Sequence, residues 1–226
     1  MRRLAFCALI VGGCGSATVE NVGTARVSTS APAPVDVPSS TVPVVAPSGG
    51  TAELVPLPIV DEPPPKPYSR EEFGGWVDVD RDCQQSRSEV LIAESTAAVT
   101  FTKPSKCTVA TGEWLDPWSG IVTTSAKALD VDHTVPLANA WRSGAWQWDR
   151  SKRVAFANEL SDPNHLIAIP LGENRSKGDR GPEGWRPPAP SAWCRYAHAW
   201  TAIKAKWGLS AVTAEWRALV EMAASC

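Results

Sequence analysis

The chain of 226 residues lacks several features that would narrow its function. It has only three histidines, and its formal net charge of −2 gives no long-range attraction for nucleic acid or for an anionic membrane. Any nucleic-acid site must therefore be a local patch. No C-x-x-C pair occurs, so a structural zinc site is not indicated. Hydrophobic residues make up 43% and charged residues 20%, the balance of an ordinary globular protein.

The first residues have the pattern of an export signal. Two arginines precede an apolar run over residues 4–11, which is too short to span a bilayer as a permanent helix. Residues 11–14, Val-Gly-Gly-Cys, resemble a bacterial lipobox, in which Cys14 would carry the lipid. A plain secretory signal cleaved nearby is the alternative. We expect a signal peptide over residues 1–13, export as a surface lipoprotein or in secreted form, and membrane contact only through the lipid.

Residues 14–67 are predicted to be a disordered tether. Eleven of the twenty prolines lie before residue 68, and the segment has no aromatic residue. Such a composition buries too little apolar surface to offset the entropy lost on ordering. The folded domain is therefore expected over residues 68–226, held away from a membrane by the tether.

Four cysteines lie within the predicted domain: Cys83, Cys107, Cys194 and Cys226. Four cysteines allow three pairings, and the sequence alone does not choose among them. Proximity along the chain favours Cys83–Cys107 and Cys194–Cys226. An oxidising compartment, which the export signal implies, favours disulfides over metal binding.

Residues 129–138, LDVDHTVPLA, form the most informative stretch of the chain. In a strand, Asp130 and Asp132 project to one face and His133 to the other. Pro136 cannot continue a ladder and is expected to end the strand. A carboxylate beside an imidazole can hold a cation and take a proton from water, which is the chemistry of a metal-assisted hydrolase.

The patterns along the domain predict an α+β fold. Strands are expected at residues 99–101, 107–111, 121–124, 129–135 and 165–169. Helices are expected at residues 88–95, 137–148, 149–159 and 171–178, with two more after residue 191 that break near Gly208. Turn residues separate these elements at 116–120 and 162–164.

The order strand, helical insertion, strand, polar helix resembles the HNH, or ββα-metal, nuclease motif. Residues 130–136 (DVDHTVP) match its first strand, residues 165–169 (HLIAI) its second strand and residues 173–179 (ENRSKGD) its helix. More narrowly, the chain resembles secreted actinobacterial HNH nucleases related to the C-terminal domain of GmrSD-type restriction enzymes. Other segments that fit this pattern are Trp76-Val77-Asp78-Val79-Asp80 with Cys83 and Arg87, Trp185-Arg186-Pro187-Pro188, and Cys194.

The resemblance implies an α+β domain with a ββα-metal core and a defined set of roles. His133 would be the general base, because an imidazole can hold and release a proton at neutral pH. Asp132 and Asn174 would hold one Mg²⁺ (or Mn²⁺), an ion that commonly uses only one or two protein carboxylates. Asp130 would orient a ligand or a metal-bound water, unless it is only a solvated acid at the end of the strand.

Further roles concern phosphate contacts and the second strand. Lys177, and with it Arg175 or Arg180, would contact phosphates of the substrate. His165 stands where the family usually has asparagine, a residue that braces the loop carrying the base. Histidine can also donate and accept hydrogen bonds, so His165 is expected to brace that loop or to act as a further metal ligand.

The function that the resemblance implies is that of a metal-dependent endonuclease with DNA as substrate, little sequence specificity and products with 5′-phosphate ends. The alternative is a non-catalytic surface lipoprotein that binds DNA or cell-wall glycan on the same scaffold. Near-neutral charge and eleven tryptophans support this alternative, which predicts binding that survives the loss of His133. Hydrolysis of another phosphodiester is also open. Trp193, Trp200 and Trp207 recur every seven residues and are expected to lie in the core rather than to form a binding platform.

Overall fold

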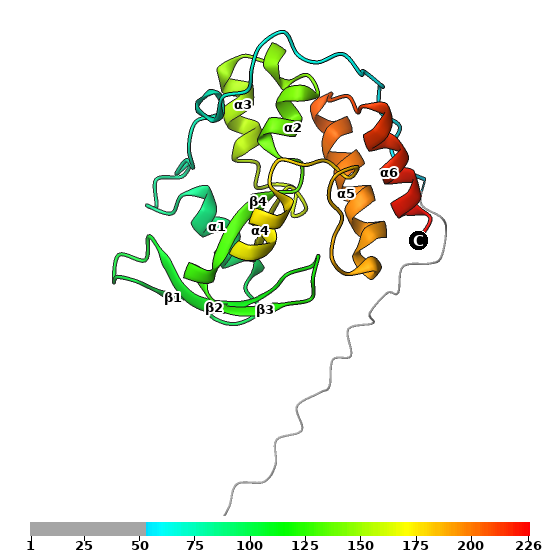
Figure 1. Ribbon diagram of the computed structural model, residues 1–226. Helices are drawn as coiled ribbons and strands as arrows, with labels where there is room; N and C mark the ends of the chain where they lie inside the picture. Colours follow the sequence, from blue (N-terminus) through cyan, green and yellow to red (C-terminus); the bar gives the residue numbers. More distant parts are fainter. Residues whose placement is uncertain (1–52) are drawn as a thin grey trace, which may run out of the picture. The chain divides into compact units, whose positions relative to one another are not determined.

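The computed structural model describes residues 53–226, so the predicted signal peptide, Cys14 and most of the predicted tether lie outside the described residues. In the described part, two small antiparallel sheets are combined with helices, which confirms a mixed α and β fold (Figure 1). None of the helices between residues 53 and 226 is both long enough and apolar enough to cross a membrane.

The elements follow the predicted order, with ends that differ by a few residues. The α-helices are α1 (Ser86–Glu94), α2 (Leu137–Arg142), α3 (Arg150–Ala157), α4 (Leu171–Lys177), α5 (Trp193–Trp207) and α6 (Thr213–Ala223). The strands are β1 (Thr100–Phe101), β2 (Val109–Leu115), β3 (Val122–Ser125), β4 (Leu129–His133) and β5 (Leu166–Pro170). The short 3₁₀ turns are η1 (Arg70–Phe73), η2 (Ala126–Ala128), η3 (Ala145–Gln147) and η4 (Pro190–Ala192).

The helix predicted over residues 137–148 is interrupted. α2 ends at Arg142, and Gly144 has a φ of 125°, a conformation that L side chains rarely adopt. The chain then turns into η3, so residues 137–148 form two short elements instead of one helix.

The three-stranded sheet has the order β1-β2-β3 and packs against α1. Trp114 of β2 is buried, and its indole Nε1 donates to the carbonyl of Leu91 in α1 at 2.8 Å. The predicted disulfide Cys83–Cys107 is present and ties the segment before α1 to the loop between β1 and β2.

The second sheet is the antiparallel pair β4-β5, which is followed directly by α4. The register runs from Leu129 opposite Pro170 to His133 opposite Leu166, so all five residues of each strand are paired. The 32 residues between the strands (134–165) carry α2, η3 and α3. Pro136 and Pro170 each precede a helix, where a fixed φ and a missing N–H cost little.

The C-terminal helices α5 and α6 form an antiparallel pair joined at Gly208, whose left-handed conformation ends α5. The predicted disulfide Cys194–Cys226 joins the start of α5 to the end of the chain. Trp200 is fully buried, and Trp193 and Trp207 are partly buried against the same core. The prediction that this tryptophan stripe belongs to the core is confirmed.

Residues 53–67, which the sequence pattern assigned to the tether, lie against the helices. Leu54 and Leu57 are buried, and Ile59 forms a parallel β-bridge with Ala211 just before α6. The indole of Trp141 donates to the carbonyl of Lys66 at 2.9 Å. Figure 1 shows this segment running beside α6 and then over α2 and α3. Two leucines thus anchor a proline-rich stretch whose composition alone predicts disorder.

Candidate active site

The end of β4 and the helix α4 meet at a cavity of about 290 Å³. Its wall includes three of the residues singled out by sequence: Asp132, His133 and Asn174. Tyr68 and Arg70, from the segment around η1, complete the same wall. The ββα order of the chain therefore brings a carboxylate, an imidazole and an amide to one concave site.

His133 lies on β4 with its ring almost wholly buried. Its Nε2 is 2.9 Å from the main-chain oxygen of Ala157 at the end of α3. Because a carbonyl only accepts, Nε2 carries the hydrogen and Nδ1 keeps the lone pair. Burial, and secondly the nearby His165, lower the pKa of His133 well below its usual value. The ring is therefore neutral at pH 7, with a proton-accepting nitrogen at Nδ1.

Two aromatic side chains fix the plane of the His133 ring. The indole of Trp76 is stacked on one side, with ring centroids 5.6 Å apart and planes 3° from parallel. The ring of Phe156 is also nearly parallel to the imidazole, at 6.3 Å and 7°. Restricting the ring in this way leaves its two nitrogens in defined directions, as a general base requires.

Asp132 is held by Lys177. The ammonium Nζ of Lys177 donates to Asp132 Oδ2 at 2.7 Å and to the main-chain oxygen of His133 at 2.7 Å. Burial raises the pKa of Asp132 and lowers that of Lys177, and the attraction between the two charges opposes both shifts. Lys177 is wholly buried and does not line the cavity. Its ammonium therefore holds the end of β4 in place and is not exposed for the phosphate contact expected from the sequence.

Asn174 projects from the middle of α4 and is oriented by Asp130 of β4. Its Nδ2 donates to Asp130 Oδ2 at 2.8 Å. With the amide nitrogen turned to that carboxylate, the amide oxygen Oδ1 points away from Asp130. Asp130 therefore positions the side chain of Asn174, and Asp132 and Asn174 each have one oxygen that is not used in these bonds.

His165 immediately precedes β5 and does not line the cavity. Its Nε2 is 2.8 Å from the main-chain oxygen of Phe156, the residue next to the carbonyl that holds His133. The main-chain oxygen of His165 also accepts from Thr134 N at 3.0 Å. Burial lowers the pKa of His165 to about 4. The ring of His165 thus contacts α3, and its main chain contacts the residue that follows His133.

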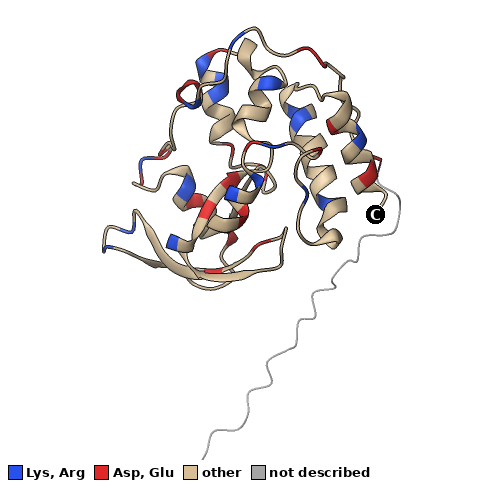
Figure 2. Ribbon diagram, viewed as in Figure 1, with Lys and Arg blue, Asp and Glu red and all other residues tan. Residues whose placement is uncertain are grey.

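The remaining predicted phosphate contacts, Arg175 and Arg180, are exposed. Neither lines the cavity, although their chain neighbours Asn174 and Asp179 do. Arg180 donates through Nε to the main-chain oxygen of Lys177 at 3.1 Å. In Figure 2, basic and acidic positions are mixed around β4 and α4, so no one-signed charged surface is seen there.

Three residues that contact or line the site were not assigned roles from sequence: Tyr68, Arg70 and Trp76. Trp76 was part of the pattern that carries the resemblance, but its contact with His133 depends on the fold. One signal was present, since aromatic residues return at Tyr68, Phe73 and Trp76 after a segment without any.

Two other groups of potential metal ligands come together within residues 53–226, and both have structural roles. The carboxylates of Asp78, Asp80 and Asp82 lie close to one another, and they accept main-chain N–H groups of the turn before α1. The second group, Cys194, His198 and Cys226, contains the disulfide.

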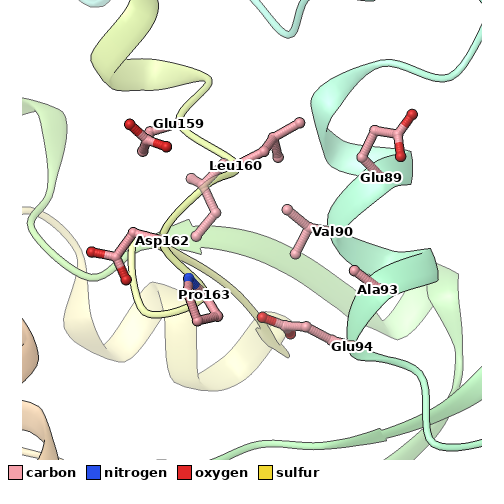
Figure 3. A pocket seen from close by; sticks show the side chains of 9 residues that line it. Glu89, Val90, Ala93, Glu94, Glu159, Leu160, Asp162 and Pro163 are labelled. Atoms are coloured by element: carbon pink, nitrogen blue, oxygen red, sulfur yellow. The ribbon is translucent and has the colours of Figure 1, made fainter.

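A second cavity, of about 310 Å³, lies between α1 and residues 159–166 (Figure 3). Apolar side chains of Val90, Ala93 and Leu160 face it, and four carboxylic acids stand around it. No histidine or basic residue lines this cavity. It therefore offers no cation for a phosphate, and the residues singled out by sequence line the first cavity instead.

The domain is similar to known proteins. The family described as GmrSD restriction endonucleases, C-terminal domain, matches residues 85–222, which include β4, β5 and α4. A relative from Arthroderma benhamiae, described as an uncharacterized secreted protein, is 39% identical over 197 residues, or 86% of this chain and 92% of the relative. No solved structure matches the chain.

Proposed function

The chain belongs to the family of GmrSD restriction endonuclease C-terminal domains, and from this premise we propose that it is a metal-dependent endonuclease that hydrolyses DNA with little sequence specificity. The observation that carries the proposal is the meeting of Asp132, His133 and Asn174 at one cavity. In this proposal β4, β5 and α4 are the ββα-metal core.

His133 is the general base of the proposed reaction. Its hydrogen bond to Ala157 leaves Nδ1 as the accepting nitrogen, and its lowered pKa keeps that nitrogen unprotonated at neutral pH. A water beside Nδ1 would give up its proton as it attacks phosphorus. A buried imidazole with a low pKa is a weak base, so the attacking water must also be made more acidic.

A divalent cation fits the donors at the cavity. One oxygen of the Asp132 carboxylate is bonded to Lys177, which leaves the other for a cation, and the amide oxygen of Asn174 is a second hard donor. Mg²⁺ or Mn²⁺ suits such oxygens, and a cavity of about 290 Å³ has room for waters and a phosphate oxygen as further ligands. Bound there, the ion would supply a more acidic water and stabilise charge on the phosphate.

We assign the remaining predicted residues as supports and contacts. Lys177 and Asp130 position Asp132 and Asn174, and His165 braces the loop after His133. The exposed Arg175 and Arg180 would contact phosphates of the substrate outside the cavity.

We further propose that the protein is exported, with Cys14 as a lipid anchor. The two disulfides suit an oxidising compartment, and the name of the Arthroderma relative supports secretion. Replacing Cys14 with serine should release the protein from membranes. A wild-type protein that is soluble and has no lipid mass would rule out the anchor and leave plain secretion.

The test of the nuclease uses the full chain with supercoiled plasmid, in Mg²⁺ or Mn²⁺ and in chelator. The wild type should nick the plasmid only with metal, and Asp132→Ala and His133→Ala should both lose the activity. His198→Ala is the matched control, because His198 lies on α5 and does not line the cavity.

Undiminished cleavage by His133→Ala would contradict the mechanism. A wild type that binds DNA or glycan without cutting would instead favour the binding module, especially if binding persists in His133→Ala.

A further inference from the structure

The proposed site has one wall that comes from outside the region matched by the family. Tyr68 and Arg70 lie upstream of residue 85 and still line the cavity with Asp132 and His133. Their segment reaches the site because it follows residues 53–67 across the helices.

Arg70 begins η1, and this turn is held firmly. Phe73, at its end, is fully buried. Glu72 pairs with Arg153 of α3 at 2.6 Å, and Arg150 of α3 donates to the main-chain oxygen of Glu71 at 3.0 Å. The same helix α3 ends at Ala157, which holds His133. Helix α3 thus contacts both the turn that carries Arg70 and the proposed base, His133.

Arg70 is also a cation without a counter-charge in this wall. Of the other cations near the cavity, Lys177 is paired with Asp132, and Arg142 is paired with Asp179 at 2.9 Å. Arg70 has no carboxylate within 4.0 Å among residues 53–226, and its side chain is exposed. A planar guanidinium at the mouth of a polar cavity suits the oxygens of a phosphate, with which it forms two parallel hydrogen bonds.

We propose that Arg70 binds the phosphate of the substrate at the cavity and stabilises its charge during hydrolysis. This inference rests on the proposed function, which it extends by a phosphate-binding residue from outside the matched domain. Its chemistry requires no metal, so it can be measured apart from cleavage.

The experiment compares full-chain wild type, Arg70→Ala, Arg70→Lys and the control Arg217→Ala. Arg217 is an exposed arginine of α6 that does not line the cavity. First, binding of a short duplex DNA is measured in chelator over a range of salt concentrations. Losing one phosphate contact should lower the slope of log K against log salt by about 1 in Arg70→Ala, and Arg70→Lys and the control should keep the slope.

Second, plasmid cleavage is measured with Mg²⁺ or Mn²⁺. Arg70→Ala should cleave about 10²- to 10³-fold more slowly, the effect of removing one donor to a developing charge. Arg70→Lys should cleave faster than Arg70→Ala because it keeps the positive charge. It should cleave more slowly than the wild type because an ammonium cannot form the two parallel hydrogen bonds of a guanidinium. Thermal unfolding checks that each variant is folded. If Arg70→Ala does not fold, the cleavage rate of Arg70→Lys is compared with that of the wild type instead.

An unchanged salt slope in Arg70→Ala overturns the inference, even if cleavage falls. If the wild type does not cleave at all, the proposed function fails, but the salt slope in chelator still decides whether Arg70 binds phosphate.

Discussion

The ammonium of Lys177 lies 2.7 Å from the carboxylate of Asp132, and neither group is open to solvent beyond a small fraction. Burying a charged group costs free energy, and two buried charges offset that cost only through their attraction for each other. The same ammonium holds the main-chain oxygen of His133 at 2.7 Å. One buried lysine from the end of α4 therefore sets the positions of two neighbouring residues of β4.

Removing the lysine should cost more than removing a surface ion pair. Lys177→Met leaves the Asp132 carboxylate buried and uncompensated, so we expect the free energy of unfolding to fall by about 3–5 kcal/mol. Lys206→Met is the control, because the Lys206–Glu159 pair (3.1 Å) is partly exposed and should be worth less than about 1 kcal/mol. Urea unfolding measures both. Similar small losses in the two variants would mean that the buried pair is not coupled as described.

His165 should tolerate a change that keeps its donor. In His165→Gln a side-chain amide can still donate to the Phe156 carbonyl, whereas His165→Phe leaves that carbonyl without its partner. We expect His165→Phe to lose about 1–3 kcal/mol of stability and His165→Gln to lose less. Because His165 does not line the cavity, the metal concentration that gives half-maximal cleavage should be unchanged in both variants. A marked rise in that concentration would identify His165 as a ligand.

Asn158 connects the end of α3 to the segment that carries Trp76. Its Oδ1 accepts from Val77 N at 3.0 Å and from Ser86 Oγ at 2.7 Å, and its Nδ2 donates to Gly75 O at 3.1 Å. Asn158→Leu should remove all of these bonds and lower stability by about 2–4 kcal/mol. Cleavage by Asn158→Leu should fall as well, because Trp76 then leaves its place against His133. Full activity in a folded Asn158→Leu would show that the Trp76 stack is not needed.

Local patterns were sufficient for much of the fold. The alternation in LDVDHTVP and the apolar run HLIAI correctly predicted β4 and β5, and β4 ends three residues before Pro136. The two disulfides followed from proximity along the chain. These features involve residues that are at most a few tens of positions apart, so the spacing of residues along the sequence is enough to predict them.

The parts that could not be predicted depend on contacts between distant segments. Lys177 looked like a surface cation on a polar helix, and only the packing of α4 on β4 buries it against Asp132, 45 residues earlier. The same holds for Arg70 and Trp76, which reach the site because residues 53–67 pack on the helices. Leu54 and Leu57 supply that packing in a segment whose proline content predicts disorder.

Glu94 gives the protein a stability that depends on pH. It lies at the end of α1 beside the cavity in Figure 3, and its Oε2 accepts from Ala168 N of β5 at 2.8 Å. Burial raises its pKa from 4.5 to about 7. The folded state therefore binds this proton more tightly than the unfolded state does. The contribution of Glu94 is most favourable below about pH 4.5, and it is lost as the pH rises to about 7.

Replacing Glu94 with glutamine should stabilise the protein at high pH only. The amide oxygen can still accept from Ala168, and the cost of burying a charge is removed, so unfolding at pH 8 should require up to roughly 3 kcal/mol more. At pH 4.5 the two proteins should be equally stable, since Glu94 is protonated when folded. Glu62→Gln is the control, because Glu62 is exposed. Stability is measured by urea unfolding at the two pH values. A gain of the same size at both, or none at pH 8, would contradict a half-buried Glu94 that binds a proton in the folded state.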